Sequence, residues 1–155
     1  MEREELYYGY CRSPIGVIEV KGTDIAVRSV DFVEMLRDGF CSTGVVDQAV
    51  QEIEEYFTGK RQQFEVPLDL QGTPFQRAVW KELLKIPYGG TVSYGEIARA
   101  IGNPKAVRAV GGANHRNPAA IVVPCHRVIG SDGSMTGYGS GIWRKEWLLK
   151  HESVR

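Results

Sequence analysis

The segment IVVPCHRVIG, residues 121–130, strongly constrains what this chain can fold into, because its apolar residues must be buried. The run Ile121–Val123 predicts a buried strand, and Pro124 ends it. Cys125 and His126 follow directly, so we expect a nucleophilic sulfur and a titratable ring where a core strand reaches the surface. Neighbouring side chains of an extended segment point apart, which favours a water bridge over a direct hydrogen bond between them.

Cys125 and His126 admit two interpretations. In the first, the thiol is a nucleophile and the imidazole is its base, and a carboxylate beyond the ring fixes the tautomer. Glu152, in the predicted C-terminal helix RKEWLLKHE, is a candidate for that carboxylate. In the second, Cys125 is a small buried apolar residue and His126 is a hydrogen-bonded core residue. The pattern alone leaves both open.

A polar connector, GKRQQFEVPLDLQGTP, divides the chain, and we expect one domain over residues 1–71 and another over 72–155. Residues 1–72 contain 7 Lys and Arg against 14 Asp and Glu, a net charge of −7. Residues 73–155 contain 12 against 5, a net charge of +7. This asymmetry favours a nucleic-acid-binding second domain beside an acidic supporting domain, the alternative being chance segregation of surface charge.

The first half predicts a small α/β arrangement. Residues 16–32 alternate apolar and polar side chains around a Gly–Asp turn, which indicates antiparallel strands. Residues 45–57 carry apolar side chains at helical spacing, and Gly59 is expected to end that helix.

The second half is predicted to be helical. Thr73 and Pro74 suit the N-cap and first position of a helix that continues to Pro87. Ser93, spaced for a capping box, begins a short helix that ends at Gly102. Asn103 then suits the N-cap of another helix that starts at once, and the pair forms a helix-turn-helix pattern.

The second helix of this pair is expected to have a narrow exposed side. Its small residues are Ala106, Ala109, Gly111, Gly112 and Ala113. Arg108 is the long cationic side chain in its middle, suited to a phosphate or to insertion into a base stack. The alternative is a small-residue face packed against a neighbouring helix, with Arg108 as an ordinary surface charge.

Three motifs in order, NPKAVRAVGGANHRNP, IVVPCHRVIG and GYGSGIWRKEWLLKHE, resemble the methylated-DNA–protein-cysteine methyltransferases, which act on O6-alkylguanine. The resemblance runs from Phe75 to Glu152 and is most specific at PCHR. It implies an α/β plus α fold: a small N-terminal ribonuclease-H-like α/β domain, followed by a C-terminal helical, winged helix-turn-helix-like DNA-binding domain.

The resemblance also implies roles for the catalytic residues. Cys125 would accept the alkyl group, and His126 would act as its base through water. Glu152 would orient His126, and Asn117 would brace the turn near the cysteine.

Further residues are implied to contact DNA or to form the base pocket. Arg108 would fill the stack after the damaged base is flipped out, and Tyr94 would press on a phosphate. The other residues expected on the DNA side are Asn103, Ala106, Ala109 and Ser131. The pocket for the flipped guanine is expected to include Tyr138, Gly139, Ser140 and Val123.

The implied activity is irreversible, single-turnover transfer of the alkyl group from O6-alkylguanine, with O4-alkylthymine as a further candidate lesion, to Cys125. The expected partner is double-stranded DNA bound through its minor groove, with no cofactor, no metal, no membrane and no obligate protein partner. A zinc cage of cysteine and histidine is not available in the first domain, which contains only Cys11 and Cys41. The N-terminus lacks an apolar signal stretch, so we expect a cytoplasmic protein. We also expect it to be a monomer.

Two other functions compete with this one. A non-catalytic lesion sensor or helix-turn-helix regulator would keep the fold without transfer, but relatives of that kind replace the cysteine that is present here. A cysteine hydrolase would need an acyl substrate and an oxyanion hole, and it leaves the basic helical half unexplained.

Overall fold

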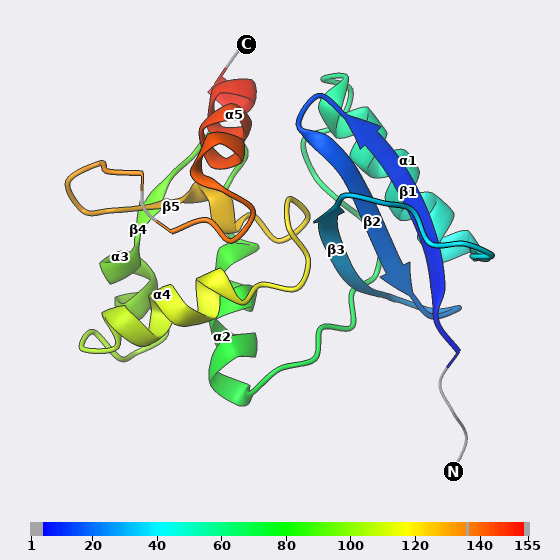
Figure 1. Ribbon diagram of the computed structural model, residues 1–155. Helices are drawn as coiled ribbons and strands as arrows, with labels where there is room; N and C mark the ends of the chain where they lie inside the picture. Colours follow the sequence, from blue (N-terminus) through cyan, green and yellow to red (C-terminus); the bar gives the residue numbers. More distant parts are fainter. Residues whose placement is uncertain (1–4, 136, 154–155) are drawn as a thin grey trace. The chain divides into compact units, whose positions relative to one another are not determined.

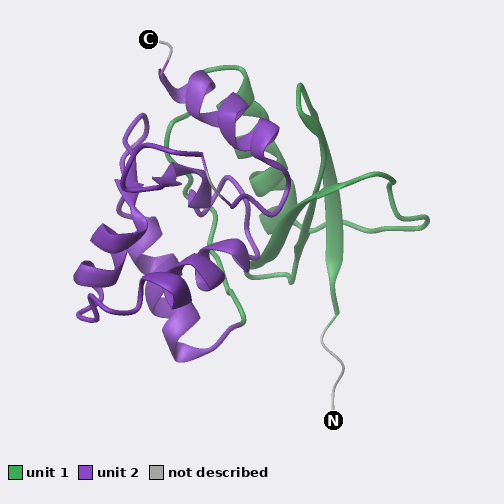
Figure 2. Cartoon of the chain, turned by 60° about the vertical axis from the view of Figure 1, so that its left-hand side comes forward, with its two compact units in different colours: residues 1–71 green, residues 72–155 purple. Residues whose placement is uncertain are grey.

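A computed structural model of the chain describes residues 5–135 and 137–153 (Figure 1). The chain forms two compact units, Met1–Gln71 and Gly72–Arg155 (Figure 2). Within the described residues, no helix has the length and apolar character needed to cross a membrane.

The first unit is built on a three-stranded antiparallel sheet in the order β1 (Tyr7–Ser13), β2 (Gly16–Gly22) and β3 (Val27–Val33). Helix α1 (Gly44–Phe57) packs against all three strands (Figure 1). The predicted strand pair and helix are therefore confirmed, and Gly59 follows the helix with a φ of +78°. Apolar side chains between helix and sheet form the core.

Strand β1 was not predicted, because its sequence YYGYCRS contains a glycine and no clear alternation. The structure explains Gly9. A Cβ built there would lie 2.8 Å from a methyl group of Val46 and 2.9 Å from one of Val50. Helix α1 therefore lies so close to β1 that a larger residue at this position would force the two elements apart.

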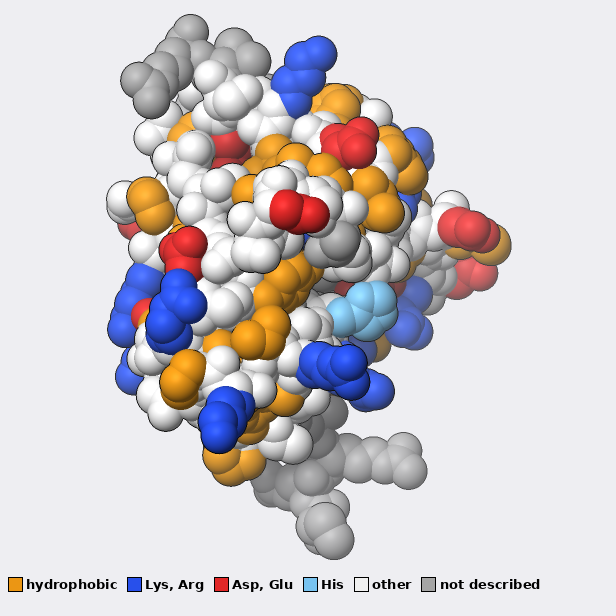
Figure 3. All heavy atoms as spheres, turned by 90° about the vertical axis from the view of Figure 1, so that its left-hand side faces the viewer, with side chains coloured by type: hydrophobic (Ala, Val, Ile, Leu, Met, Phe, Trp, Pro, Cys, Tyr) orange, Lys and Arg blue, Asp and Glu red, His pale blue; other side chains and the backbone are white. Residues whose placement is uncertain are grey.

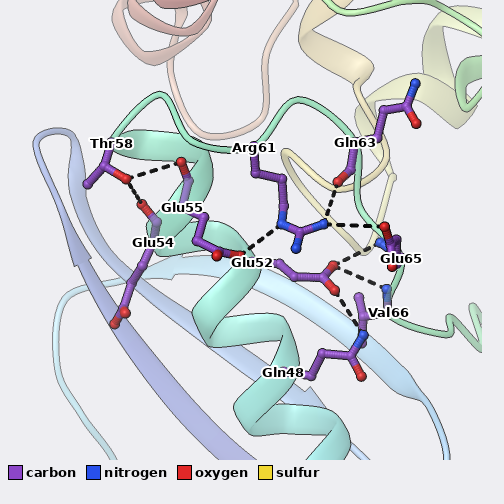
Figure 4. Close-up of polar contacts among 9 residues, drawn as sticks. All are labelled: Gln48, Glu52, Glu54, Glu55, Thr58, Arg61, Gln63, Glu65 and Val66. Atoms are coloured by element: carbon purple, nitrogen blue, oxygen red, sulfur yellow. Dashed lines mark hydrogen bonds and ion pairs between the residues drawn. The ribbon is translucent and has the colours of Figure 1, made fainter.

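The connector is fixed to the first unit by buried and half-buried polar groups (Figure 4). The Glu52 carboxylate, 3% exposed, accepts hydrogen bonds from the backbone N–H groups of Glu65 (2.9 Å) and Val66 (3.1 Å). Arg61 donates to Glu55 at 3.0 Å. Further along, the backbone N–H and the backbone carbonyl of Val27 each form a hydrogen bond of 2.8 Å with the backbone of the connector. The connector is thus largely an extension of the first unit.

In the second unit, α2 (Pro74–Leu83) begins as predicted, with a complete capping box between Thr73 and Gln76. It ends earlier than predicted. The backbone N–H of Ile86 bonds to the carbonyl of Leu83 at 3.0 Å, so the chain tightens into a turn before Pro87.

Helices α3 (Tyr94–Ala100) and α4 (Val107–His115) pack against each other as the helix pair that the sequence indicates. Ser93 caps α3, as predicted, by accepting from the backbone N–H of Glu96 at 3.1 Å. The predicted start of α4 is wrong. Asn103 lies in a turn, its carbonyl accepting from the N–H of Ala106 at 3.0 Å, and the helix begins four residues later.

The buried strand predicted for Ile121–Val123 is also wrong. These residues form successive tight turns that lead into a 3₁₀ turn, η1 (Cys125–Arg127). Strand structure follows the cysteine: β5 (Val128–Ile129) pairs in parallel with β4 (Val92–Ser93). The chain ends in α5 (Ile142–Ser153) (Figure 1). The apolar residues are buried, as expected, but in turns rather than in a sheet.

Candidate active site

The backbone before Cys125 is folded tightly and held under strain. Ile121 has a φ of +74°, which is rare for a β-branched residue, and it is 1% exposed. Pro124, at φ −81° and ψ 64°, forms an inverse γ-turn in which the N–H of Cys125 bonds to the carbonyl of Val123 at 2.8 Å. These turns fix the position of the cysteine from its N-terminal side.

Asn117 braces the same turns. Its Nδ2 donates to the carbonyl of Val123 at 2.8 Å, and its Oδ1 accepts from the N–H of Ala119 at 3.0 Å. The side chain therefore bridges two residues that flank Ile121. Asn117 thus bonds to the same Val123 carbonyl that closes the γ-turn before Cys125.

His126, Arg127 and Glu152 form a buried cluster. Nε2 of His126 lies 2.7 Å from Oε2 of Glu152. Arg127 donates to the same carboxylate through Nε (2.7 Å) and Nη2 (2.9 Å), and through Nη1 to the carbonyl of Ile86 at 2.8 Å. Helix α5 thus holds its carboxylate against the segment that carries the cysteine.

The electrostatics of this cluster fix the protonation of His126. Burial raises the pKa of Glu152, but the hydrogen bonds from His126 and Arg127 together outweigh it and hold the pKa well below its usual range. Burial lowers the pKa of His126, against the opposing effect of Glu152. The ring is therefore neutral at pH 7, with Nε2–H donating to an ionised Glu152 and Nδ1 left as an acceptor.

Cys125 is 7% exposed, and burial raises the pKa of its thiol. Asn117 and the positive charge of Lys145 act in the opposite direction. Burial in turn lowers the pKa of Lys145, while the charge of a Cys125 thiolate would raise it. The thiol is thus mostly protonated in the resting protein, and it needs a base before it can act as a nucleophile.

Two further residues of this site, Arg127 and Lys145, were not predicted from the sequence. Lys145 is fully buried and donates through Nζ to the carbonyl of Val128 at 2.5 Å. It precedes Glu152 by seven residues, two turns of helix, and this spacing could have placed both on one face of α5. No comparable spacing signals that Arg127, next to His126, turns inward.

Of the four residues predicted to line the base pocket, Val123 and Tyr138 lie near the cysteine. Val123 is fully buried, and Tyr138 is 7% exposed. Burial and the nearby Cys125 raise the pKa of Tyr138 well above its ordinary value. Gly139 lies against the end of α4, where a Cβ would be 3.5 Å from the carbonyl of His115. The carbonyl of Ser140 accepts from Arg144 at 2.9 Å.

Tyr94, predicted to contact a phosphate, begins α3 and lies near Lys145 and Gly137. Its ring centroid is 6.0 Å from Nζ of Lys145. A Cβ built at Gly137 would lie 3.7 Å from the Tyr94 hydroxyl. The pairing of β4 with β5 explains this position, because it sets the start of α3 beside the chain that leaves the 3₁₀ turn.

Most of the residues predicted to contact DNA are exposed. Asn103, Arg108, Ala109 and Ser131 are exposed and Ala106 is half-buried. Ala113 is 4% exposed and so does not belong to the exposed side of α4, where the sequence analysis placed it. Figure 3, viewed from the α3–α4 side, shows basic side chains on both sides of a hydrophobic band in its lower half.

Two models of known protein domains match this chain. Residues 74–154 match the model of the 6-O-methylguanine DNA methyltransferase DNA-binding domain, and residues 6–70 match that of the ribonuclease-like domain of the same proteins. Both the order of the two domains and the mixed fold class predicted from the sequence are confirmed.

Relatives match over almost the full chain. A methylated-DNA–protein-cysteine methyltransferase of Methanosarcina barkeri is 48% identical over 95% of this chain and 97% of its own. The crystal structure of the Mycobacterium tuberculosis O6-methylguanine methyltransferase has a TM-score of 0.87 and 47% identity, over 96% of this chain and 93% of that one. A complex of the M. tuberculosis protein with DNA has a TM-score of 0.86 and 48% identity, over 95% and 92%. The chain belongs to the 6-O-methylguanine DNA methyltransferase family.

Proposed function

We propose that this protein repairs DNA by direct reversal, moving the alkyl group of O6-alkylguanine irreversibly onto Cys125. The observation that carries the proposal is a buried histidine, His126, that is hydrogen-bonded to Glu152 and directly follows a cysteine held in strained turns. Only a thiolate among side chains is both soft and strong enough as a nucleophile for a saturated carbon on an ether oxygen.

In the proposed reaction, the thiol proton passes through a water molecule to Nδ1 of His126, and Glu152 stabilises the imidazolium. The thiolate attacks the alkyl carbon, and a carbon–sulfur bond replaces the carbon–O6 bond. The electron pair of the broken bond stays on guanine O6, and the base takes up the proton that left the thiol. Tyr138 in the pocket assists the departing base by hydrogen bonding.

The product is a thioether, which no group described in the site can cleave. Each chain would therefore perform one transfer. This stoichiometry follows from the chemistry of the acceptor and requires neither a cofactor nor a metal in the proposed steps.

The helix pair supports a role in DNA binding. The target atom lies inside the duplex stack, so the base must be flipped out, which costs a few kcal/mol. Arg108, exposed in the first turn of α4, would fill the gap from the minor groove, and the small residues around it would allow close approach. Tyr94 would press on the flipped nucleotide.

We assign DNA binding and transfer to residues 72–155, and a supporting role to the α/β domain of residues 1–71. The protein would act as a monomer on double-stranded DNA. We place it in the cytoplasm, because an acceptor thiol must stay reduced to react.

The direct test follows the lesion in the DNA. A duplex with one O6-methylguanine is incubated with the protein or with Cys125→Ser, and the digested nucleosides are quantified. We expect conversion to guanine in proportion to protein, and none with the variant. Binding with the lesion intact would support the sensor instead, and lesion loss exceeding one per chain would support a hydrolytic enzyme.

A further inference from the structure

Three polar atoms near the nucleophile lack a hydrogen-bond partner among the described residues: the hydroxyl of Tyr138, which has a proton to donate, and two atoms that can only accept. The two acceptors are Nδ1 of His126 and Oδ1 of Asn114, and both are buried. Asn114 was not singled out by the sequence analysis. It lies on the inner side of α4, 2% exposed, and its Nδ2 donates to the carbonyl of Cys125 at 3.4 Å. Its amide oxygen shares a carbon atom with that nitrogen, so it too lies next to the cysteine.

Both atoms are acceptors. His126 donates through Nε2 to the ionised Glu152, which leaves only a lone pair on Nδ1. An amide oxygen has no proton to donate. The two atoms cannot satisfy each other, and buried acceptors in native proteins are normally paired. A group with two donors is needed between them, and a water molecule has two.

We propose that Asn114 is a positioning residue, whose Oδ1 holds the water that carries the thiol proton of Cys125 to His126. The water donates one hydrogen to Oδ1 and one to Nδ1, and its oxygen accepts from the thiol. During transfer it takes the thiol proton and gives the Nδ1 hydrogen to the ring, so the water itself is unchanged. This inference rests on the proposed function and extends it to one more residue.

The position of Asn114 makes the arrangement rigid. The indole N–H of Trp80 donates to the carbonyl of the preceding residue, Ala113, at 2.8 Å and fixes this turn of α4 against α2. The donor half of the Asn114 amide holds the cysteine backbone, and the acceptor half is left for the water. Water held on one acceptor alone would be free to rotate away from the thiol.

The test measures how readily the thiol ionises, without DNA. The protein is reacted with iodoacetamide over a range of pH, and capping of the Cys125 peptide is followed by mass spectrometry, which separates it from Cys11 and Cys41. We expect Asn114→Leu to move the half-maximal pH upward by about one unit, so that capping near neutral pH slows about tenfold. Transfer from an O6-methylguanine duplex should slow by a similar factor.

Val110→Ala is the matched control, because it removes buried apolar contacts one turn before Asn114 on α4 and leaves the Asn114 amide intact. It should lower the melting temperature without moving the half-maximal pH. An unchanged half-maximal pH in Asn114→Leu, or an equal shift in Val110→Ala, would overturn the proposal. If Asn114→Leu does not fold, Asn114→Ala is measured in the same way. Failure of the wild-type protein to transfer would contradict the proposed function, whereas the capping profile still decides the role of Asn114.

Discussion

Three short hydrogen bonds converge on one buried carboxylate at Glu152, and Arg127 donates two of them. The pairing of Glu152 with His126 could be expected from the sequence, because a histidine base needs an orienting acid. Arg127 could not be expected, since no periodicity shows that a residue leaving a 3₁₀ turn points inward. Its role as the main counter-charge of Glu152 emerges only from the folded structure.

We predict that Arg127→Met destabilises the second unit by about 3–5 kcal/mol, because it leaves a buried carboxylate without its cation. Urea denaturation followed by tryptophan fluorescence measures this, since all three tryptophans lie in residues 72–155. Lys85→Met is the control. The ion pair of Lys85 with Glu82, 3.1 Å long, lies at the surface, and its loss should lower the free energy of unfolding by about 1 kcal/mol or less. Equal losses in the two variants would contradict the assignment.

The same cluster predicts how stability depends on pH. Folding lowers the pKa of both His126 and Glu152, so each contributes stability above its unfolded pKa that is lost on acidification. The free energy of unfolding should fall as pH drops below about 6.5, through His126, and further below about 4.3, through Glu152. Tryptophan-detected urea titrations between pH 8 and 4 test this. Stability that increases toward pH 5 would show that His126 is charged in the folded state.

At the scale of elements, the caps of two helices were predictable and the segment around the cysteine was not. Thr73 and Ser93 begin α2 and α3 as their side-chain chemistry requires. The apolar run Ile121–Val123 carries the composition of a strand, yet it folds into turns that place Ile121 in a conformation that ordinary sequence rules disfavour. Such local strain depends on surrounding contacts, here the Asn117 brace, which no short pattern encodes.

The start of α4 shows a second limit. Asn103 and Pro104 have the residue types of a helix start, but the chain makes one more turn before Val107. Within α4, Ala113 is buried, whereas Arg108 and Ala109 are exposed. The exposed arginine remains as the sequence predicted.

We predict that Arg108→Ala slows repair of duplex DNA at least tenfold and leaves reaction with the free base O6-benzylguanine within about twofold, because the arginine supports flipping rather than bond making. Single-turnover rates with both substrates measure the difference. Arg99→Ala, which removes an exposed cation from α3, is the control. Equal slowing of both reactions by Arg108→Ala would contradict a role in flipping.

For the molecule as a whole, the net charge of zero conceals two oppositely charged domains. The division at the connector could be predicted from charge and composition, because the two halves of the sequence carry opposite net charges. The attachment of the connector to the first unit could not be predicted from the sequence. It depends on Glu52, a buried carboxylate that accepts hydrogen bonds from two backbone N–H groups.

We predict that DNA binding weakens steeply with salt despite the neutral net charge. Residues 94–116 carry four cationic side chains, all exposed: Arg99, Lys105, Arg108 and Arg116. If all four neutralise phosphates, affinity should fall about a hundredfold between 50 and 200 mM salt. Fluorescence anisotropy with a labelled duplex measures the slope. An affinity independent of salt would mean that this surface does not contact the DNA backbone.

The central claim, that the sulfur of Cys125 is permanently capped, is tested most directly by weighing the protein after reaction with excess O6-methylguanine duplex. We predict a gain of one methyl group per chain, found on the Cys125 peptide and unchanged by fresh DNA. A folded, DNA-bound protein whose Cys125 remains unmodified after prolonged exposure would contradict the account.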